Sequence, residues 1–149
     1  MELNRDFQEF LQSFVTHEVR FLIVGGYALA AHGHPRYTKD LDVWVWADPS
    51  NSPRIIDALE VFGFGDLDLS ASDFEQAGVV VQLGREPQRI DILTFATGLE
   101  FPDAYERRML VELGGIEVPF VSLEDLRVNK RAAGRLRDLA DLEDLPPVD

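Results

Sequence analysis

The stretch VGGYALAAHGHPRYTKDLDVWVW, Val24 to Trp46, decides the fold of this chain. It begins where the apolar run RFLIV (20–24) reaches the pair Gly25-Gly26. RFLIV predicts a buried strand, YALAAHG (27–33) a short helix, and KDLDVWVW (39–46) a second strand. The stretch therefore predicts a strand, a glycine turn, a helix and a second strand that carries two acids.

The two aspartates of the second predicted strand share one face. Because side chains alternate between the faces of a strand, Asp40 and Asp42 point one way while Leu41 and Val43 point the other. Neighbouring carboxylates repel each other unless a cation or a proton neutralises them. Mg²⁺ prefers oxygen ligands and is usually held by one or two carboxylates together with substrate phosphates. The pattern therefore indicates a Mg²⁺ site.

A third acid and the glycines fit the same chemistry. Asp91 lies in RIDIL (89–93), between isoleucines expected to face the core. If this strand lies beside the first acidic strand, three carboxylates converge, as in a two-metal site with ions about 3.5–4 Å apart. Gly25 and Gly26 would let the backbone approach a ligand closely, and the N-terminus of the helix after them favours a triphosphate.

Each feature alone also has a purely structural explanation. The glycines could form only a strand-to-helix turn, and Asp91 could be a surface acid of an edge strand. The acid–apolar–acid pattern is weak in a chain with 27 acidic residues, and its second copy at 66–68 is expected in a solvated loop. What favours function is the order: strand, glycines, helix, strand with two acids, later strand with one.

The composition is that of one soluble domain. The chain has 149 residues, a net charge of −13 and no cysteine, which excludes disulfides and thiolate metal sites. No apolar run approaches the roughly 20 residues of a membrane span, and the N-terminus has no signal-peptide pattern. We therefore expect a cytoplasmic protein without a membrane partner. The negative charge disfavours nucleic acid unless a local basic patch exists.

The whole chain predicts an α/β (α+β) fold, a small mixed sheet flanked by helices, in one domain over 1–149. Its core is expected over about 20–121 and its C-terminal helices over about 122–145. An amphipathic helix is predicted over 3–17, and two strands joined by REPQ (85–88) predict a hairpin.

Several local features are predicted with less direct evidence. Ser52 is a candidate N-cap, with Pro53 at the first position of the helix that follows. Pro119 interrupts a short strand, so an edge position is expected. Trp44 and Trp46 share the face of Asp42 and either stack on a base or acceptor or cover the sheet.

The order of elements resembles the nucleotidyltransferase superfamily related to DNA polymerase β. The superfamily has an apolar strand, Gly-Gly or Gly-Ser, acid–apolar–acid–apolar, and a third acid on a later strand; here these are FLIVGG, DLDV and RIDI. The stretch from Gly25 to Val43 is similar to small prokaryotic nucleotidyltransferases. These include AbiEii-like toxins of toxin–antitoxin systems and, more distantly, lincosamide and aminoglycoside antibiotic nucleotidyltransferases. The resemblance covers 20–46 and, less closely, 79–95, and the C-terminal helices also look like the family's closing helices.

The resemblance implies transfer of NMP from an NTP to a hydroxyl of a small molecule, a tRNA end or a protein. Asp40 and Asp42 would ligate Mg²⁺, or Mn²⁺ in its place, and Gly25-Gly26 would cradle the NTP. Asp91 would activate the acceptor hydroxyl as general base or complete the ion nearest the acceptor. The protein could be the toxin of a toxin–antitoxin system, with an antitoxin or a homodimer mate completing the pocket. The alternative is a non-catalytic nucleotide-binding or protein-interaction module.

Three further residues are nucleotide-binding candidates. Arg36 either contacts phosphate bidentately or pairs with a nearby carboxylate. Thr38 shares the face of Asp40 if the strand starts early. Lys130 lies on the predicted C-terminal helix, where related enzymes have a lysine that reaches the triphosphate. The alternative is that Lys130, with Asp138 on the same predicted helix face, belongs to a solvated row of ion pairs.

Overall fold

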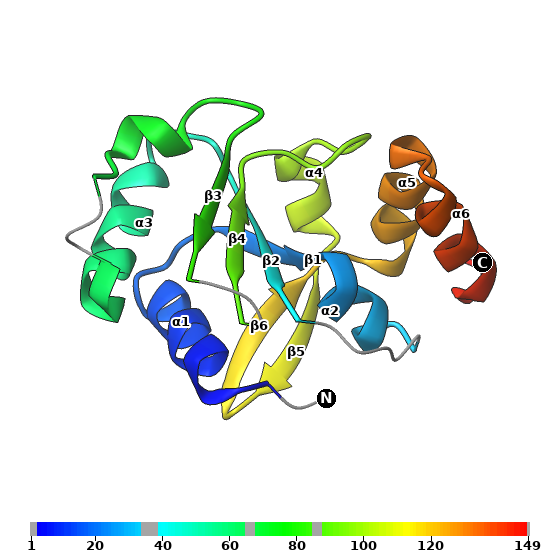
Figure 1. Ribbon diagram of the computed structural model, residues 1–149, viewed down its shortest axis with the longest axis horizontal. Coiled ribbons are helices and arrows are strands. Elements are labelled where there is room, and N and C mark those ends of the chain that lie inside the picture. The colour runs from blue at the N-terminus through cyan, green and yellow to red at the C-terminus, as the bar shows by residue number, and fades with distance from the viewer. Residues whose placement is uncertain (1–2, 34–38, 65–67, 85–87, 149) are drawn as a thin grey trace.

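A computed structural model describes residues 3–33, 39–64, 68–84 and 88–148 of the chain. Its centre is a six-stranded mixed sheet with the strand order β3-β4-β2-β1-β6-β5 (Figure 1). The strands are β1 (Phe21–Val24), β2 (Leu41–Val45), β3 (Val80–Leu83), β4 (Ile90–Leu93), β5 (Met109–Leu113) and β6 (Ile116–Phe120). The predicted mixed α/β sheet flanked by helices is confirmed.

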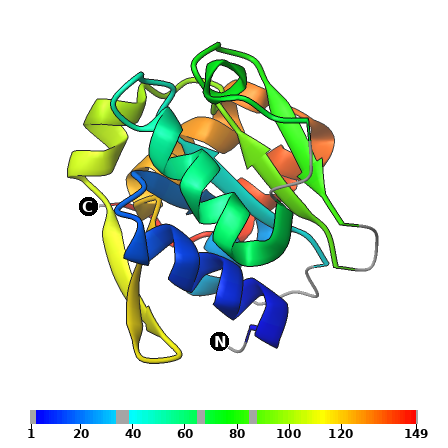
Figure 2. The ribbon, with the colours of Figure 1, turned by 90° about the vertical axis from the view of Figure 1, so that its left-hand side faces the viewer.

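Helices cover both faces of the sheet. Figure 2 shows α1 and α3 in front of the strands and the C-terminal helices behind them. The helices are α1 (Arg5–Thr16), α2 (Gly25–Ala31), α3 (Ser52–Leu59), α4 (Phe101–Glu106), α5 (Leu123–Ala133) and α6 (Leu136–Asp144), with short π and 3₁₀ turns η1 (Glu60–Phe64) and η2 (Ala71–Phe74). Among the described residues, no helix is long and apolar enough to cross a membrane.

Helix α1 is fixed by its cap and by its aromatic stripe. The backbone N–H of Phe7 donates to the Asn4 side chain at 2.9 Å, which satisfies one of the open donors of the first turn. Phe7, Phe10 and Phe14 follow at helical spacing and are almost completely buried. Each such burial is worth about 1.5–3 kcal/mol relative to an exposed ring, so this face anchors the helix to the sheet.

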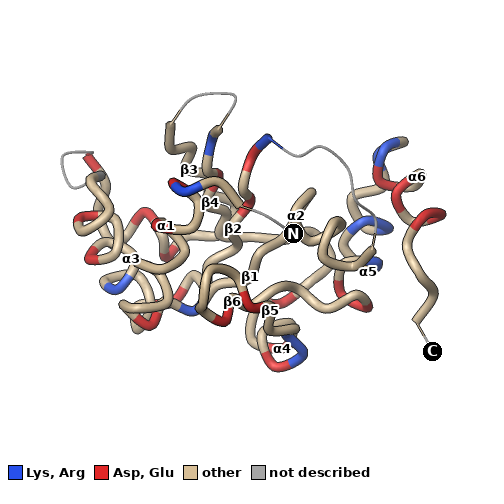
Figure 3. Tube along the Cα trace, turned by 90° about the horizontal axis from the view of Figure 1, so that it is seen from below, with Lys and Arg blue, Asp and Glu red and all other residues tan. Residues whose placement is uncertain are grey.

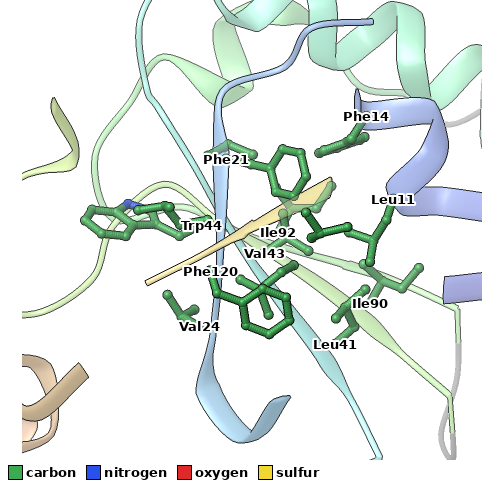
Figure 4. Packing of buried hydrophobic residues seen from close by; sticks show 14 of the residues in the cluster. Leu11, Phe14, Phe21, Val24, Leu41, Val43, Trp44, Ile90, Ile92 and Phe120 are labelled. Carbon is green, nitrogen blue, oxygen red and sulfur yellow. The ribbon is translucent and has the colours of Figure 1, made fainter. Parts of the chain in front are cut away.

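The two faces of the central strands have different partners. Figure 4 shows Phe14 of α1 beside the face that carries Val43 and Ile92, whereas Trp44 lies on the opposite side. Trp44 is 2% exposed and packs edge-on against Phe101, with ring centroids 5.1 Å apart. Trp44 therefore covers the sheet, as the simpler of the two interpretations held.

The hairpin predicted around 85–88 is present, because β3 and β4 pair antiparallel. The expected edge position of Pro119 is wrong, since β6 lies between β1 and β5. Proline is tolerated there because β6 pairs with β1 only at its end, where Ile23 faces Phe120 and Val121 N–H donates to the Ile23 carbonyl at 3.1 Å.

The N-cap of α3 is Asn51 rather than Ser52. The Asn51 side chain makes no cap bond; it accepts from Arg20 N–H at 2.8 Å and donates to the carbonyl oxygens of Arg20 and Trp46, both at 3.0 Å. It thus joins the chain before β1 to the chain after β2. Ser52 is buried, and its hydroxyl donates to Glu75.

The C-terminal segment forms two helices. Gly134 ends α5 in the left-handed region with φ 66°, and α6 begins two residues later. Lys130 and Asp138 are therefore on different helices, not on one helical face as predicted, although they still meet. Ser122 is the N-cap of α5, since its hydroxyl accepts from Asp125 N–H at 3.1 Å.

Candidate functional site

Three aspartates predicted to share a site come together at one end of β2 and β4. The two strands run parallel, and their register places Asp42 directly opposite Asp91. Asp40 immediately precedes β2, two residues before Asp42 and on the same strand face. The convergence required by the sequence argument is therefore present in the structure.

Arg89 binds two of these three carboxylates. Its Nε donates to Asp91 Oδ1 at 2.8 Å, and its Nη2 donates to Asp91 Oδ2 and to Asp40 Oδ2, both at 3.1 Å. The Arg89 side chain is 25% exposed, so these bonds are only partly open to water. The guanidinium offsets part of the repulsion between the acids. Arg89 is a site residue that the sequence analysis missed, although it shares a strand face with Asp91.

Asp42 is the least compensated of the three acids. Burial, followed by the charges of Asp91 and Asp40, raises its pKa to about 7, although Arg89 and Lys130 act in the opposite direction. Asp40 has a related deficiency: its Oδ1 atom is buried and has no hydrogen-bond partner among the described residues. Both observations identify carboxylate oxygens that a bound cation would stabilise.

Gly25 brings the backbone against Asp42. It has φ 69°, a conformation that glycine adopts without a steric penalty. A Cβ added there would lie 2.1 Å from Asp42 Oδ2. The fit follows from the sheet, because Val24 of β1 pairs with Asp42 of β2 and Gly25 is the next residue. The glycine turn and the carboxylates are therefore one compact unit.

One cleft of about 800 Å³ connects the predicted site residues. Its lining is mostly polar, and Leu93 and Phe95 are among the apolar residues that line it. Six residues singled out from the sequence line this cleft: Gly25, Gly26, Asp40, Asp42, Asp91 and Lys130.

Lys130 reaches the cleft from α5 and is held by acids of α6. Its side chain is 8% exposed, and Nζ lies 3.2 Å from Asp138 Oδ1 and 3.1 Å from Asp141 Oδ2. Burial favours the protonated form of Asp138, but hydrogen bonds from Arg135 and Lys130 outweigh it and lower its pKa to about 2. Figure 3 shows basic and acidic positions close together along α5 and α6. Lys130 thus forms ion pairs, as the alternative interpretation predicted, but these pairs are buried and not solvated.

The sequence of the chain matches a known family along nearly its whole length. Residues 2–145 match the family described as "Nucleotidyltransferase of unknown function (DUF6036)". The chain belongs to this nucleotidyltransferase family. No curated protein is similar enough in sequence to match it.

Solved structures show the same fold for this nucleotidyltransferase at low sequence identity. A candidate nucleotidyltransferase from Thermotoga maritima has 15% identity and a TM-score of 0.61, with 96% of this chain and 94% of that chain covered. The lincosamide antibiotic adenylyltransferase LnuA, bound to lincomycin, has 16% identity and a TM-score of 0.60, with 96% of both chains covered. An antigenic nucleotidyltransferase-like protein from Paracoccidioides brasiliensis has 16% identity and a TM-score of 0.53, with 93% and 72% covered.

The structure shows different things for the other polar and aromatic residues of the stretch Val24–Trp46 in this nucleotidyltransferase. Arg36 and Thr38 lie outside the described residues. His32 is partly buried, and its Nε2 is 2.8 Å from the carbonyl oxygen of Val121, so it ties α2 to the end of β6. Trp46 stacks on Phe101 at 6.3 Å, on the same side of the sheet as Trp44.

Metal ligation was predicted for all three aspartates. Within the described residues, no group of three or more His, Cys, Asp or Glu side chains is arranged to hold a metal ion as it stands. The contacts of Arg89 give a physical reason, because a guanidinium lies between Asp40 and Asp91.

Proposed function

We propose that this family member is a metal-dependent enzyme that transfers NMP from an NTP to a hydroxyl acceptor. The observation that carries the proposal is the convergence of Asp42 and Asp91, from two strands, on the Gly25 turn in one cleft. Membership of a nucleotidyltransferase family supports the reaction class.

Asp40 and Asp42 are the residues that would hold Mg²⁺, or Mn²⁺ in its place. The unpartnered, buried Oδ1 of Asp40 and the raised pKa of Asp42 fit a cation, and two carboxylates with substrate phosphates suit Mg²⁺. A bound Mg²⁺ would orient the triphosphate and stabilise the negative charge that develops during transfer. Asp91 is the third carboxylate of this site.

The glycine turn and Lys130 would bind the triphosphate. Gly25 and Gly26 line the cleft beside Asp42, where the absence of a Cβ lets phosphate oxygens approach the backbone. Lys130 lines the same cleft and carries a positive charge. In the reaction, the acceptor oxygen attacks the α-phosphorus, the bond between the α-phosphorus and the α–β bridging oxygen breaks, and pyrophosphate leaves with that oxygen. The proton of the acceptor hydroxyl passes to Asp91 as general base and from there to water.

A small molecule is the acceptor that we favour. The net charge of −13 opposes tRNA, because nucleic-acid binding depends on basic residues that neutralise phosphates. One protein of the same fold is an antibiotic adenylyltransferase bound to lincomycin. Transfer to a tRNA end or to a protein would instead fit a toxin that is silenced by an antitoxin, and the acceptor assay separates these cases.

The function can be tested with NTPs labelled at the α-phosphate. The protein, with Mg²⁺ or Mn²⁺, is offered a panel of hydroxyl-bearing small molecules, total tRNA and a cell lysate, in separate reactions. We expect label on a small molecule with wild type and none with Asp40→Asn or Asp42→Asn. Asp48 is only partly buried and lies after β2, outside the cleft, so Asp48→Asn is the matched control and should keep transfer.

A non-catalytic nucleotide-binding module is the second candidate. The observation that favours it is the pairing of Arg89 with Asp40 and Asp91, which neutralises part of the acidic cluster without a metal. In that case calorimetry would show NTP binding, and none of the acceptors would receive label.

A further inference from the structure

The oxygen atoms of the three aspartates fall into two groups. Arg89 contacts both oxygens of Asp91 and the Oδ2 atom of Asp40. The Oδ1 atom of Asp40 and the carboxylate of Asp42 receive no hydrogen bond from Arg89, and Asp40 Oδ1 has no partner among the described residues. The Arg89 guanidinium thus binds one side of the cluster, and on the other side no basic side chain among the described residues contacts Asp40 Oδ1.

A second divalent ion would compete with Arg89 for the same atoms. Mg²⁺ binds oxygen at about 2.0–2.1 Å, and Arg89 nitrogens already lie 2.8 and 3.1 Å from the Asp91 oxygens. An ion on those oxygens would therefore lie within a few ångström of a guanidinium that is three-quarters buried, where like charges repel strongly. An ion between Asp40 Oδ1 and Asp42 would instead bind oxygens for which no hydrogen bond from Arg89 is seen among the described residues.

We propose that Arg89 takes the place of a second metal ion, so that the site holds a single divalent cation between Asp40 and Asp42. The inference rests on the proposed function and narrows it: the two-ion site considered from the sequence becomes a site of one ion and one guanidinium. Arg89 is then a positioning residue. Its bidentate hydrogen bonds to Asp91 and its hydrogen bond to Asp40 hold the two carboxylates in position. Its guanidinium also supplies the positive charge that a second ion supplies in a two-metal site.

Electron paramagnetic resonance of bound Mn²⁺ tests this inference without an activity measurement. Two Mn²⁺ ions about 3.5–4 Å apart are magnetically coupled and differ in spectrum from an isolated ion. With Mn²⁺ and α,β-methylene ATP, which cannot transfer its α-phosphate, wild type should show an isolated ion. Arg89→Gln should bind Mn²⁺ at least about tenfold more tightly and show the coupled pair, because Asp91 is released from the guanidinium.

Three variants control the experiment. Arg89→Lys keeps a cation beside Asp91 and should retain the isolated ion. Arg108→Gln removes an exposed arginine that contacts Tyr105 outside the cleft and should leave the spectrum of wild type. Asp42→Asn should lose the bound ion. Thermal melts by circular dichroism confirm that each variant is folded, and Arg89→Met, which removes the same charge, replaces Arg89→Gln if that variant does not fold.

The outcomes separate this inference from the proposed function. A coupled pair in wild type would overturn the single-ion site while leaving nucleotidyl transfer intact. An isolated ion with unchanged affinity in Arg89→Gln would also overturn it, since Arg89 would not be excluding a second ion. An isolated ion in wild type together with no label transfer to any acceptor would support the inference and overturn the function. Failure of wild type to bind Mn²⁺ would overturn both.

Discussion

Asp42 and Asp91 lie opposite each other on the parallel strands β2 and β4, although 48 other residues separate them in the chain. Arg89 pairs with Asp91 but makes no hydrogen bond to Asp42. The two facing carboxylates therefore have different electrostatic environments. Without a bound cation, the charged form of Asp42 is therefore the most unfavourable of the three carboxylates. The first prediction follows from this difference.

Asp42 should make the protein less stable as the pH rises. Its pKa is raised from 3.8 to about 7 in the folded state, so the folded protein binds more protons than the unfolded chain between these values. Stability is then lost as the pH rises through this window. At pH 8, the free energy of unfolding of Asp42→Asn should exceed that of wild type by roughly 1–3 kcal/mol, after allowance for partial exposure. At pH 4, the two proteins should have the same free energy of unfolding.

Urea unfolding at the two pH values measures this difference. Added Mg²⁺ should raise the stability of wild type at pH 8 and leave Asp42→Asn unchanged, because only the carboxylate binds the ion strongly. An Asp42→Asn protein that is less stable than wild type at pH 8 would show that the carboxylate is satisfied without a metal.

Gly25→Ala should damage both the fold and nucleotide binding. The new methyl group would meet Asp42 Oδ2 at 2.1 Å, so the turn or the carboxylate must move. We expect a loss of about 1–3 kcal/mol from this overpacking, in addition to about 1 kcal/mol for alanine at positive φ.

Gly115→Ala is the matched control for the backbone effect. Gly115 has φ 85°, and nothing lies within 4 Å of a Cβ added there. Calorimetric NTP affinity should fall at least about tenfold in Gly25→Ala and stay unchanged in Gly115→Ala. Equal effects of the two substitutions on stability and affinity would refute a specific contact between Gly25 and the site.

Lys130→Met should be strongly destabilising. The substitution leaves Asp138 and Asp141, which are 0% and 4% exposed, without the lysine that lies between them. Removing one partner of a buried ion pair typically costs about 3–5 kcal/mol. Arg137→Met, at an exposed residue of the same cleft, should change the free energy of unfolding by less than about 0.5 kcal/mol. Chemical denaturation of both variants measures the contrast, and a mild effect of Lys130→Met would contradict a buried network.

Asp138 should contribute stability that acid removes. Its pKa is lowered from 3.8 to about 2 in the folded state, so its contribution is present above pH 4 and is lost as the pH falls towards 2. Asp138→Asn should be less stable than wild type by about 1–3 kcal/mol at pH 6, and the difference should shrink at pH 2. A difference that is independent of pH would show that packing, not charge, is responsible.

Much of the core site could be predicted from the sequence because it depends on local periodicity. Alternation along a strand puts Asp40 and Asp42 on one face, and the glycine pair marks the end of β1. What alternation alone does not provide is the pairing of strands. The position of Asp91 beside Asp42 depends on β4 lying next to β2, a contact between distant segments that was an explicit condition of the prediction.

The parts that could not be predicted depend on tertiary contacts. Arg89 shares a face with Asp91, but its bridge to Asp40 exists only once β2 and β4 are adjacent. Pro119 predicted an edge strand because proline has no N–H to donate to a neighbouring strand. In the structure β6 pairs with β1 only at Phe120, so an interior strand can hold this proline. Gly134 was a visible helix-ending residue, yet the amphipathic pattern across it favoured a single helix.

The central claim, transfer of a nucleotidyl group at the aspartate cluster, is tested most directly by following two labels on one NTP. With the acceptor identified by the α-label screen, the same reaction is run with label at the α-phosphate and, separately, at the γ-phosphate. We predict that the α-label moves to the acceptor, that the γ-label appears only in pyrophosphate, and that Asp42→Asn abolishes both. Appearance of the γ-label on the acceptor, or transfer that persists in Asp42→Asn, would contradict the account.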